Sequence, residues 1–299
     1  MTARTAGGIA AVIVNYESGP ALARCATGLL AEGVTELVVV DNGSTDGSVA
    51  LLESAVPEAA VVVTGRNLGY GSAANRGVAA TNASVVLVCN PDVVVAPGVL
   101  AALADAMEAD PRRALAGPLI RRPDGERYPS ARRFPSMVDA AGHAAIGLFT
   151  PRNRFTRTYH QADLEHEATI TDVDWVSGAC FLVRRVAFEQ VGGFDEAYFM
   201  YAEEVDLCWR LGRTGWRVAY VPAAEVTHLQ GVSTDRHPYR MIVEHHRSAL
   251  RFAARTSSGA GRLLLPLVAV GMGARCTMAC LLQLVRSRSR AAKDRDPRL

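Results

Sequence analysis

Short apolar runs alternate with amphipathic stretches over the first 120 residues of the chain. The runs are rich in valine, apolar on both faces and bounded by Gly, Asn, Asp or Pro, which predicts buried strands. The predicted strands are Ile9–Asn15, Glu36–Asp41, Ala60–Thr64 and Ser84–Cys89. The predicted helices are Pro20–Ala31, Asp46–Ser54, Ser72–Ala80 and Pro97–Ala109. We therefore expect an α/β fold, with a Rossmann-like, mostly parallel sheet covered by helices on both faces and functional residues at the carboxyl ends of its strands.

The pattern changes after residue 120, and we expect a second half of the same domain over residues 121–256. Polar, aperiodic sequence predicts loops at Arg121–Arg133 and Pro151–Thr169. Regular structure is predicted again at Val173–Arg184, Glu203–Arg213, Trp216–Val221, Glu225–His228 and Tyr239–Arg255. A third region, residues 257–299, forms an apolar and basic tail.

The tail contains an apolar stretch, Leu263–Val285, that is interrupted by Pro266 and Arg275. The two resulting segments are too short to span a bilayer, so we expect an apolar helical segment that lies on a membrane surface. Residues 286–299 hold six basic and two acidic residues, a net charge of +4, which suits an anionic leaflet. A buried helical hairpin or a contact in a homodimer is the alternative.

Composition excludes several classes of protein. The 299 residues are 49% hydrophobic with a formal net charge of +2, which excludes a mainly disordered chain. Because +4 of this charge lies in the tail, the remaining 285 residues carry −2, and no basic groove for nucleic acid is expected. The first eight residues do not resemble a signal peptide, and the six cysteines form no CxxC pair, so we expect reduced core thiols.

Three strand ends carry candidate chemistry. The predicted second strand ends in Asp41-Asn42-Gly43-Ser44, where a carboxylate could accept the N3–H group of a uracil or thymine ring; a plain capping turn is the alternative. The predicted fourth strand is followed by Asn90-Pro91-Asp92. One carboxylate there suits a divalent cation that is shared with a diphosphate, although a lone Asp in a turn is often structural.

A glycine-containing segment follows the predicted third strand. Gly69, Gly71 and Ala74 fit the dinucleotide fingerprint G-x-G-x-x-A before a helix. However, four residues separate the strand from Gly69, and the fingerprint normally lies on the first strand of its fold. A dehydrogenase is therefore the less favoured interpretation of this segment.

Together, in this order, these segments resemble the family 2 glycosyltransferases with a GT-A fold, over roughly residues 9–256. The resemblance rests on the Val-Val-Asp-Asn-Gly-Ser segment, the Asn-x-Gly segment with a later Asn, and a D-x-D-like motif whose first Asp is replaced by Asn90. It implies an Mg²⁺ or Mn²⁺ cofactor. The implied nucleotide-sugar-binding residues are Asn15, Asp41, Asn42, Ser44, Arg66, Asn67, Gly69, Asn75, Asn90, Pro91 and Asp92.

The second half supports the same resemblance. The Glu203-Glu204-Val205-Asp206 segment is similar to the E-D-x-D motif of the family, and the resemblance places the catalytic base at Glu204. An inverting transfer needs one such base to take the proton of the acceptor hydroxyl. The plain alternative is an acidic helix N-terminus that complements the helix dipole.

The resemblance also implies residues for the metal and the acceptor. His228 matches a late His of the family, so Asp92 and His228 are the implied metal ligands. Trp175, Gly178 and Glu203 are the implied acceptor-binding residues, with a core role as the alternative for Trp175. We interpret the remaining histidines as surface or loop residues: His143, His160, His166, His237, His245 and His246.

Within this family the chain most resembles bacterial, cell-wall L-rhamnosyltransferases. This implies dTDP-rhamnose as donor, a polyprenyl-diphosphate-linked N-acetylglucosamine as acceptor, and a position on the cytoplasmic face of the membrane. The basic Arg121–Arg133 segment could then face the lipid diphosphate, or be a solvated loop. A UDP-sugar donor, a sugar-1-phosphate nucleotidyltransferase and a non-catalytic carbohydrate-binding protein are the alternatives. A nucleotidyltransferase should carry a Gly-rich basic loop after its first strand, and Asn15-Tyr16-Glu17-Ser18 is not one.

Overall fold

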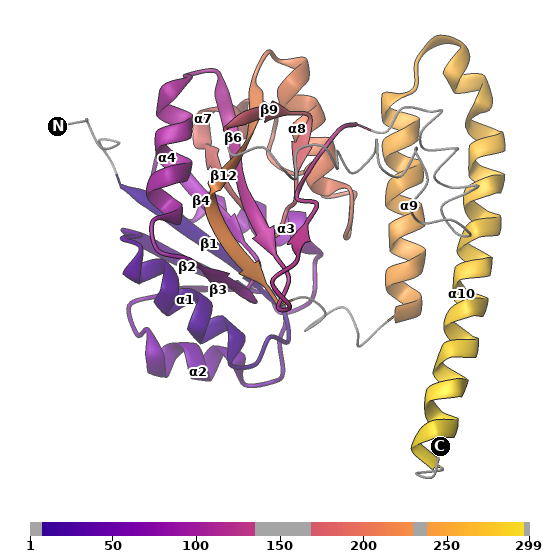
Figure 1. Ribbon diagram of the computed structural model, residues 1–299, viewed down its shortest axis with the longest axis horizontal. Helices are drawn as coiled ribbons and strands as arrows, with labels where there is room; N and C mark the ends of the chain where they lie inside the picture. The colour runs from indigo at the N-terminus through magenta and orange to yellow at the C-terminus, as the bar shows by residue number, and fades with distance from the viewer. Residues whose placement is uncertain (1–7, 135–168, 230–237, 296–299) are drawn as a thin grey trace. The chain divides into compact units, whose positions relative to one another are not determined.

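The computed structural model describes residues 8–134, 169–229 and 238–295 (Figure 1). The chain divides into two compact units. The first comprises Met1–Phe199 and Glu203–Ser233, and the second comprises Met200–Ala202 and Thr234–Leu299. The sequence-based division at residue 256 grouped the helix before it with the first unit, whereas contacts group that helix with the C-terminal segment. The loop expected at Pro151–Thr169 lies almost wholly outside the described residues, as do His143, His160, His166 and His237.

The first unit is built on a mixed, mostly parallel sheet (Figure 1) with the strand order β3-β2-β1-β4-β11-β6-β12-β5. The four predicted N-terminal strands are β1 (Ile9–Asn15), β2 (Glu36–Asp41), β3 (Ala60–Val63) and β4 (Val85–Cys89). All pairings among these four are parallel, as expected from their apolar faces. The remaining strands are β5 (Val93–Val95), β6 (Arg113–Arg121), β7 (Arg127–Tyr128), β8 (Ala131–Arg132), β9 (Thr171–Val173), β10 (Trp175–Val176), β11 (Cys180–Arg184) and β12 (Arg217–His228).

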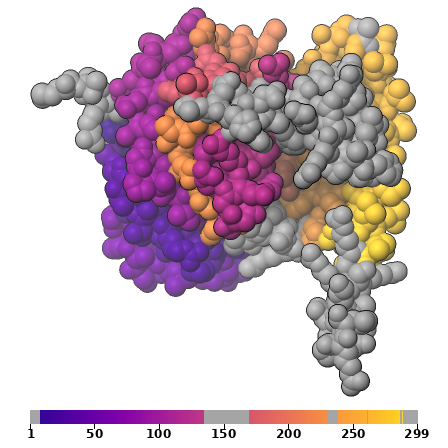
Figure 2. Space-filling model, in the orientation of Figure 1, coloured from indigo at the N-terminus to yellow at the C-terminus, as the bar shows by residue number. Residues whose placement is uncertain are grey.

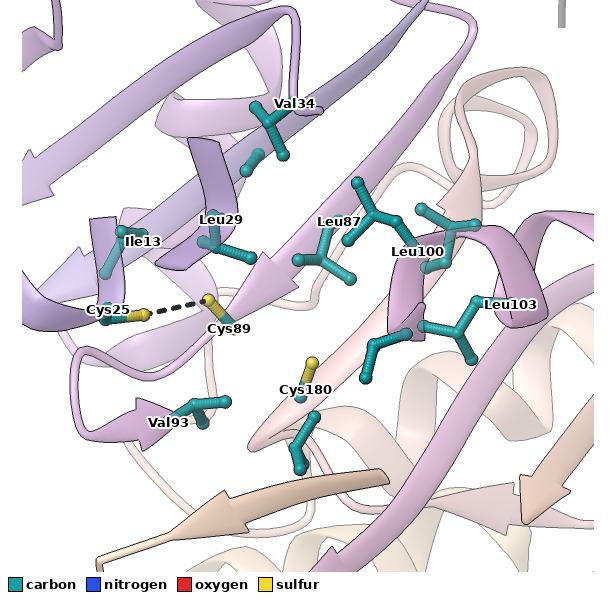
Figure 3. Packing of buried hydrophobic residues seen from close by; sticks show 14 of the residues in the cluster. Ile13, Cys25, Leu29, Val34, Leu87, Cys89, Val93, Leu100, Leu103 and Cys180 are labelled. Carbon is teal, nitrogen blue, oxygen red and sulfur yellow. Dashed lines mark hydrogen bonds between the residues drawn. The ribbon is translucent and has the colours of Figure 1, made fainter. Parts of the chain in front are cut away.

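Helices cover both faces of this sheet. The helices of the first unit are α1 (Ala21–Ala31), α2 (Ser48–Ala55), α3 (Tyr70–Ala79), α4 (Val99–Ala109), α7 (Arg185–Gln190) and α8 (Glu203–Arg213). Side chains of α1, α2 and α4 share one core with alternate residues of the strands, among them Ile13 and Val39 (Figure 3). Gly77 of α3 packs against Val12 and Val40, which point to the opposite face because side chains alternate along a strand.

The second half of the sheet departs from the expected pattern in two places. The Arg121–Arg133 segment is not a simple loop, because it holds β7, which pairs with β6, and β8, which pairs with β10. The two strands expected at residues 216–228 are one strand, β12, with a register shift between Val221 and Glu225. Pro222 lies within that irregularity, where a residue without an N–H group is tolerated.

Four of the six cysteines lie in the core. Cys25, Cys89, Cys180 and Cys208 are buried free thiols, as expected. The Sγ atoms of Cys25 and Cys89 lie 3.9 Å apart (Figure 3), and Cys25 Sγ lies 3.6 Å from the Asn90 carbonyl oxygen. Cys276 and Cys280 are also free but lie half-buried on the C-terminal helix, so the expectation of a core thiol is wrong for these two.

The second unit contains α9 (Pro238–Thr256), the 3₁₀ turn η3 (Gly259–Leu264) and α10 (Leu265–Arg295). Among the described residues, one helical stretch, Gly261–Val285, has the length and composition to cross a membrane. Its mean hydropathy is 1.7 and none of it is buried; Figure 2 shows its yellow side chains at the surface. The expectation of two segments too short to span is wrong, because Pro266 lies in the first turn of α10, where proline is tolerated, and the helix continues through Arg275.

The two described histidines of α9 differ. His245 is exposed, as expected, whereas His246 is buried and its Nδ1 atom lies 2.7 Å from the Ile242 carbonyl oxygen. The expectation of a surface position is therefore wrong for His246. The helix turns this residue inward, because neighbours on a helix differ by about 100° in direction.

Candidate active site

Asn15 and Asp41 meet where β1 and β2 end. They are direct partners in the parallel register, and both are buried. The Asn15 amide donates to Asp41 Oδ1, Ser44 Oγ and Ser48 Oγ at 2.9–3.1 Å. The Ser44 N–H donates to both Asp41 oxygens at 3.3 Å. These bonds fix the orientation of the carboxylate, and Asp41 keeps acceptor capacity for a donor on a ligand.

A second predicted group, Asn42 and Asn67, shapes the loop after β3. Asn42 Oδ1 accepts the Leu68 N–H, and its amide donates to the Gly69 carbonyl and to Asn67 Oδ1. Asn67 Oδ1 also accepts the Gly69 N–H at 2.9 Å. These side chains hold the loop beside the Asp41 turn, so their direct role is positional. Arg66 is exposed on the same loop.

Gly69 meets a strict steric requirement. Its φ of +90° is in the range that favours glycine, and a Cβ there would collide with the carbonyl oxygen of Phe199. Tyr70, the next residue, donates its N–H to that same oxygen at 3.1 Å. The loop after β3 is thereby attached to the segment that leads toward α8.

Asn75 lies away from this group. Its amide donates to the Phe194 carbonyl and to Glu196, and its Oδ1 accepts the Phe194 N–H. The side chain thus joins α3 to the segment after α7. Its amide is occupied by these protein partners, so the geometry adds no support to its predicted contact with the nucleotide.

Asp92 and His228 come together from distant parts of the chain. His228 pairs with Val93 in the β12–β5 ladder, which places it beside the Asn90-Pro91-Asp92 turn. His228 Nε2 lies 3.1 Å from Asp92 Oδ1 and 3.2 Å from Asn90 Nδ2. The side chains of His228 and Asp92 are 14% and 8% exposed.

This donor set fits a divalent cation that is shared with a ligand. A carboxylate oxygen and an imidazole nitrogen, both nearly enclosed, can each ligate Mn²⁺, and Mg²⁺ keeps several water or phosphate ligands of its own. No group of three or more His, Cys, Asp or Glu side chains with metal-binding geometry occurs in the described parts of the chain. The remaining ligands would therefore come from a diphosphate and water. Asn90, which replaces the first Asp of the motif, contacts His228 through its amide.

Glu203 and Glu204 begin α8. Glu203 is buried, and burial raises its pKa well above the usual range, with a further contribution from the charge of Glu204. Burial also raises the pKa of Glu204, opposed by backbone N–H groups at its own position, Val205 and Gly178 and by the charge of Arg132. The Oε2 atoms of both residues are shielded from solvent and have no hydrogen-bond partner among the described residues. Buried acceptors of this kind are suited to a ligand hydroxyl.

Gly178 and Trp175 have different surroundings. A Cβ at Gly178 would lie 3.3 Å from Glu204 Cβ and 3.7 Å from its carboxyl carbon, so only glycine leaves this side of the carboxyl group open. Trp175 is 4% exposed, its Nε1–H donates to the Arg133 carbonyl, and Arg132 lies over its ring. This packing adds no support to the implied contact of Trp175 with the acceptor and is what the core alternative predicts.

Sequence reasoning missed three residues that shape the site. Tyr70 is buried in α3 and donates its hydroxyl to the Gly178 carbonyl at 2.7 Å. Glu17, with a φ of +52°, accepts the N–H and hydroxyl of Thr45 and so fixes the turn after β2. Arg132 acts on Glu204 through its charge. Tyr70 directly follows the Asn-x-Gly segment, a signal that could have identified it, whereas Glu17 and Arg132 carry no comparable sequence signal.

Comparisons with known proteins agree with this geometry. A model of glycosyl transferase family 2 matches residues 10–192. The chain is 45% identical over 261 residues to the N-acetylglucosaminyl-diphospho-decaprenol L-rhamnosyltransferase of Mycobacterium tuberculosis, covering 83% of this chain and 84% of the relative.

Two solved structures share the fold at low sequence identity. One is GalNAc-T7 with UDP, GalNAc and Mn²⁺, with a TM-score of 0.56 and 14% identity over 84% of this chain and 52% of that chain. The other is the mannosyltransferase PcManGT from Pyrobaculum calidifontis in complex with GDP-Man and Mn²⁺, with a TM-score of 0.55 and 15% identity over 97% of this chain and 81% of that chain. From the family match, the mycobacterial relative and this shared architecture, we conclude that the chain belongs to glycosyl transferase family 2 and is a glycosyltransferase with the GT-A fold.

Proposed function

We propose that the protein transfers L-rhamnose from dTDP-rhamnose to a polyprenyl-diphosphate-linked N-acetylglucosamine, with inversion at the anomeric carbon. The observation that carries this proposal is the 45% identity to the mycobacterial rhamnosyltransferase over 83% of the chain. The chemistry is supported by one enclosed carboxyl group with an unpaired oxygen, Glu204, and by the pair of Asp92 and His228 at the strand ends.

Each of the proposed site residues has a separate role in the reaction. Asp41, held by Asn15 and Ser44, accepts the N3–H group of the donor base. Glu204 accepts the proton of the acceptor hydroxyl as that oxygen attacks the anomeric carbon, and the nucleoside diphosphate leaves from the opposite side. Glu203, whose pKa burial raises well above its usual range, contacts the acceptor sugar by a hydrogen bond. A bound Mg²⁺ or Mn²⁺ ion, held by Asp92 and His228, would neutralise the charge of the departing diphosphate.

We place this reaction on the cytoplasmic face of the membrane, since its acceptor carries a lipid. The exposed apolar stretch Gly261–Val285 is about 38 Å long at 1.5 Å per residue, which exceeds the ~30 Å of a hydrocarbon core. The basic residues that follow it suit anionic headgroups. We propose that α10 holds the enzyme on the membrane.

The function is tested by incubating the purified protein with a panel of nucleotide sugars and a short-chain prenyl-diphosphate-linked N-acetylglucosamine. We expect a rhamnosylated product from dTDP-rhamnose and, by NMR, an anomeric configuration opposite to that of the donor. Transfer from a UDP-sugar alone would contradict the donor assignment. Release of pyrophosphate from dTTP and a sugar 1-phosphate, without transfer, would favour the nucleotidyltransferase alternative.

A further inference from the structure

A short two-stranded ribbon supports the start of α8. Strands β8 and β10 pair with Arg132 opposite Trp175 and Ala131 opposite Val176. The Ser177 N–H donates to the Ser130 carbonyl, and the Ser130 hydroxyl donates to the Pro118 carbonyl of β6. The first bond extends the pairing of the ribbon, and the second attaches the ribbon to the main sheet.

The Arg132 side chain is fixed within this ribbon. Its Cζ atom lies 4.9 Å from the centroid of the Trp175 ring and 5.4 Å from that of the Tyr128 ring. Its Nη2–H donates to the Tyr128 hydroxyl at 3.0 Å, and its Nε–H donates to the Pro129 carbonyl at 2.8 Å. Two ring contacts and two hydrogen bonds restrain the guanidinium group, which suits a charge that must act from a fixed place.

The segment that follows β10 contacts the proposed base, Glu204. Three residues after Trp175, Gly178 packs against the Glu204 side chain, from its Cβ to its carboxyl carbon. The groups that interact with Glu204 are Glu203 on the same helix, Tyr70 of α3, Cys208 of α8 and Arg132. Burial raises the pKa of Tyr70 well above its usual value and that of the Cys208 thiol to about 12, so both are neutral at pH 7. Among these groups, Arg132 is the one whose charge favours the ionised form of Glu204.

We propose that Arg132 is a positioning residue whose positive charge, fixed by Tyr128 and Trp175 on the ribbon that packs against the start of α8, favours the ionised form of Glu204 against the effect of burial and so prepares it to accept the proton of the acceptor. This inference rests on the proposed function, because it assigns a role to the same base. It gives a role to a basic residue that is fixed over two aromatic rings and whose charge acts on Glu204.

The test compares the pH dependence of kcat/KM for wild type and Arg132→Gln, with dTDP-rhamnose and the short-chain acceptor. The base is inactive when protonated, so activity falls as the pH drops through its pKa. Loss of a neighbouring opposite charge should move this acid limb upward by about one pH unit or more. We therefore expect a roughly tenfold loss along the acid limb of the wild-type profile and recovery to near wild-type activity at the alkaline plateau.

Arg133→Gln is the matched control, since it removes the same charge from the next, exposed residue, and its acid limb should not move. If the glutamine variant does not fold, Arg132→Met, which keeps an unbranched stem against both rings, is read in the same way. A folded Arg132 variant that is inactive at every pH, or that raises the KM of the donor while its acid limb stays in place, would overturn the inference. Failure of the wild type to transfer sugar would instead refute the proposed function.

Discussion

At the scale of single residues, the two adjacent glutamates at the start of α8 have different surroundings although they are neighbours in sequence. Both have enclosed oxygens without a partner among the described residues, and both have raised pKa values, yet Glu204 alone lies against Gly178. Glu204 is therefore packed against a glycine, whereas Glu203 is 5% exposed. Their different surroundings predict different consequences of substitution.

We expect Glu204→Gln to lower kcat by about 100-fold or more with little change in donor affinity, because glutamine keeps the shape and removes the proton acceptor. Glu203→Gln, the matched change, should act mainly on the KM of the acceptor. Steady-state kinetics with both substrates measure this. The base assignment is off by one residue if the change at 203 abolishes turnover while the change at 204 leaves it intact.

Asp41→Ala should weaken the binding of free dTDP by about 1.5–3 kcal/mol, the scale of one charge-assisted hydrogen bond. Calorimetric titration of dTDP and UDP measures the loss. Asp105→Ala, which removes an exposed carboxylate from α4, serves as the control and should leave both affinities unchanged. Equal affinities in the Asp41 variant and the wild type would remove Asp41 from the nucleotide site.

Asp92→Asn and His228→Ala should each reduce the affinity for Mn²⁺ in the presence of dTDP by more than about tenfold, a loss that even residues outside the ligand shell can cause. Electron paramagnetic resonance of added Mn²⁺ reports the free ion directly, independently of turnover. Full transferase activity in excess chelator would contradict the metal assignment.

At the scale of elements, the loop between β3 and α3 shows what a sequence can and cannot predict. The Asn-x-Gly pattern identified the loop, but its partner, the Phe199 carbonyl, is 130 residues away and could be found only from the fold. β1, β2 and β4 were predictable because strands buried on both faces are apolar throughout. The run of valines also identified β3, although it lies at the edge of the sheet and is partly exposed. The ribbon of β8 and β10 was not, since two-residue strands have no periodicity.

The Gly69→Ala variant should have a distinctly lower free energy of unfolding than the Gly65→Ala variant. Both positions have a positive φ and share a backbone cost of about 1–2 kcal/mol for a non-glycine residue. Gly65 has open space around its Cα, whereas a Cβ at Gly69 meets backbone, which adds about 1–3 kcal/mol. Denaturant unfolding of the two variants measures the difference. Equal free energies of unfolding would show that the Phe199 segment moves freely away.

At the scale of the whole molecule, the predicted pair of Asp92 and His228 lies together in the structure, whereas the prediction for the C-terminal stretch is wrong. The family resemblance implied that Asp92 and His228 act together, and the structure brings them within 3.1 Å because β12 pairs with β5, which follows the Asp92 turn. The C-terminal stretch was misjudged, because Pro266 and Arg275 were both taken as interruptions from their positions alone, whereas α10 contains both residues. Whether proline breaks a helix depends on where the helix begins, and the sequence left that start undetermined.

Deleting residues 263–299 should release the protein from the membrane fraction, since it removes the exposed apolar stretch and the basic residues after it. The soluble product should still hydrolyse dTDP-rhamnose slowly, because α9 and the whole first unit remain. Fractionation by centrifugation and alkaline carbonate extraction of the full chain measure attachment. A shortened protein that stays in the pellet would point to another anchor.

The contacts of Met200–Ala202, the three residues just before Glu203, determine where this chain can be shortened for crystallisation. Tyr201 and Ala202 adopt φ values of +67° and +61°, and this segment is held by α9, where the Ser248 hydroxyl donates to the Met200 carbonyl and the His245 ring contacts Tyr201. A chain that ended before residue 238 would lack α9. The two left-handed residues directly before Glu203 would then lose the contacts that α9 makes with their segment. A shortened chain should therefore end after residue 256, because that boundary removes the apolar helix α10 and keeps the contacts that α9 makes with Met200 and Tyr201.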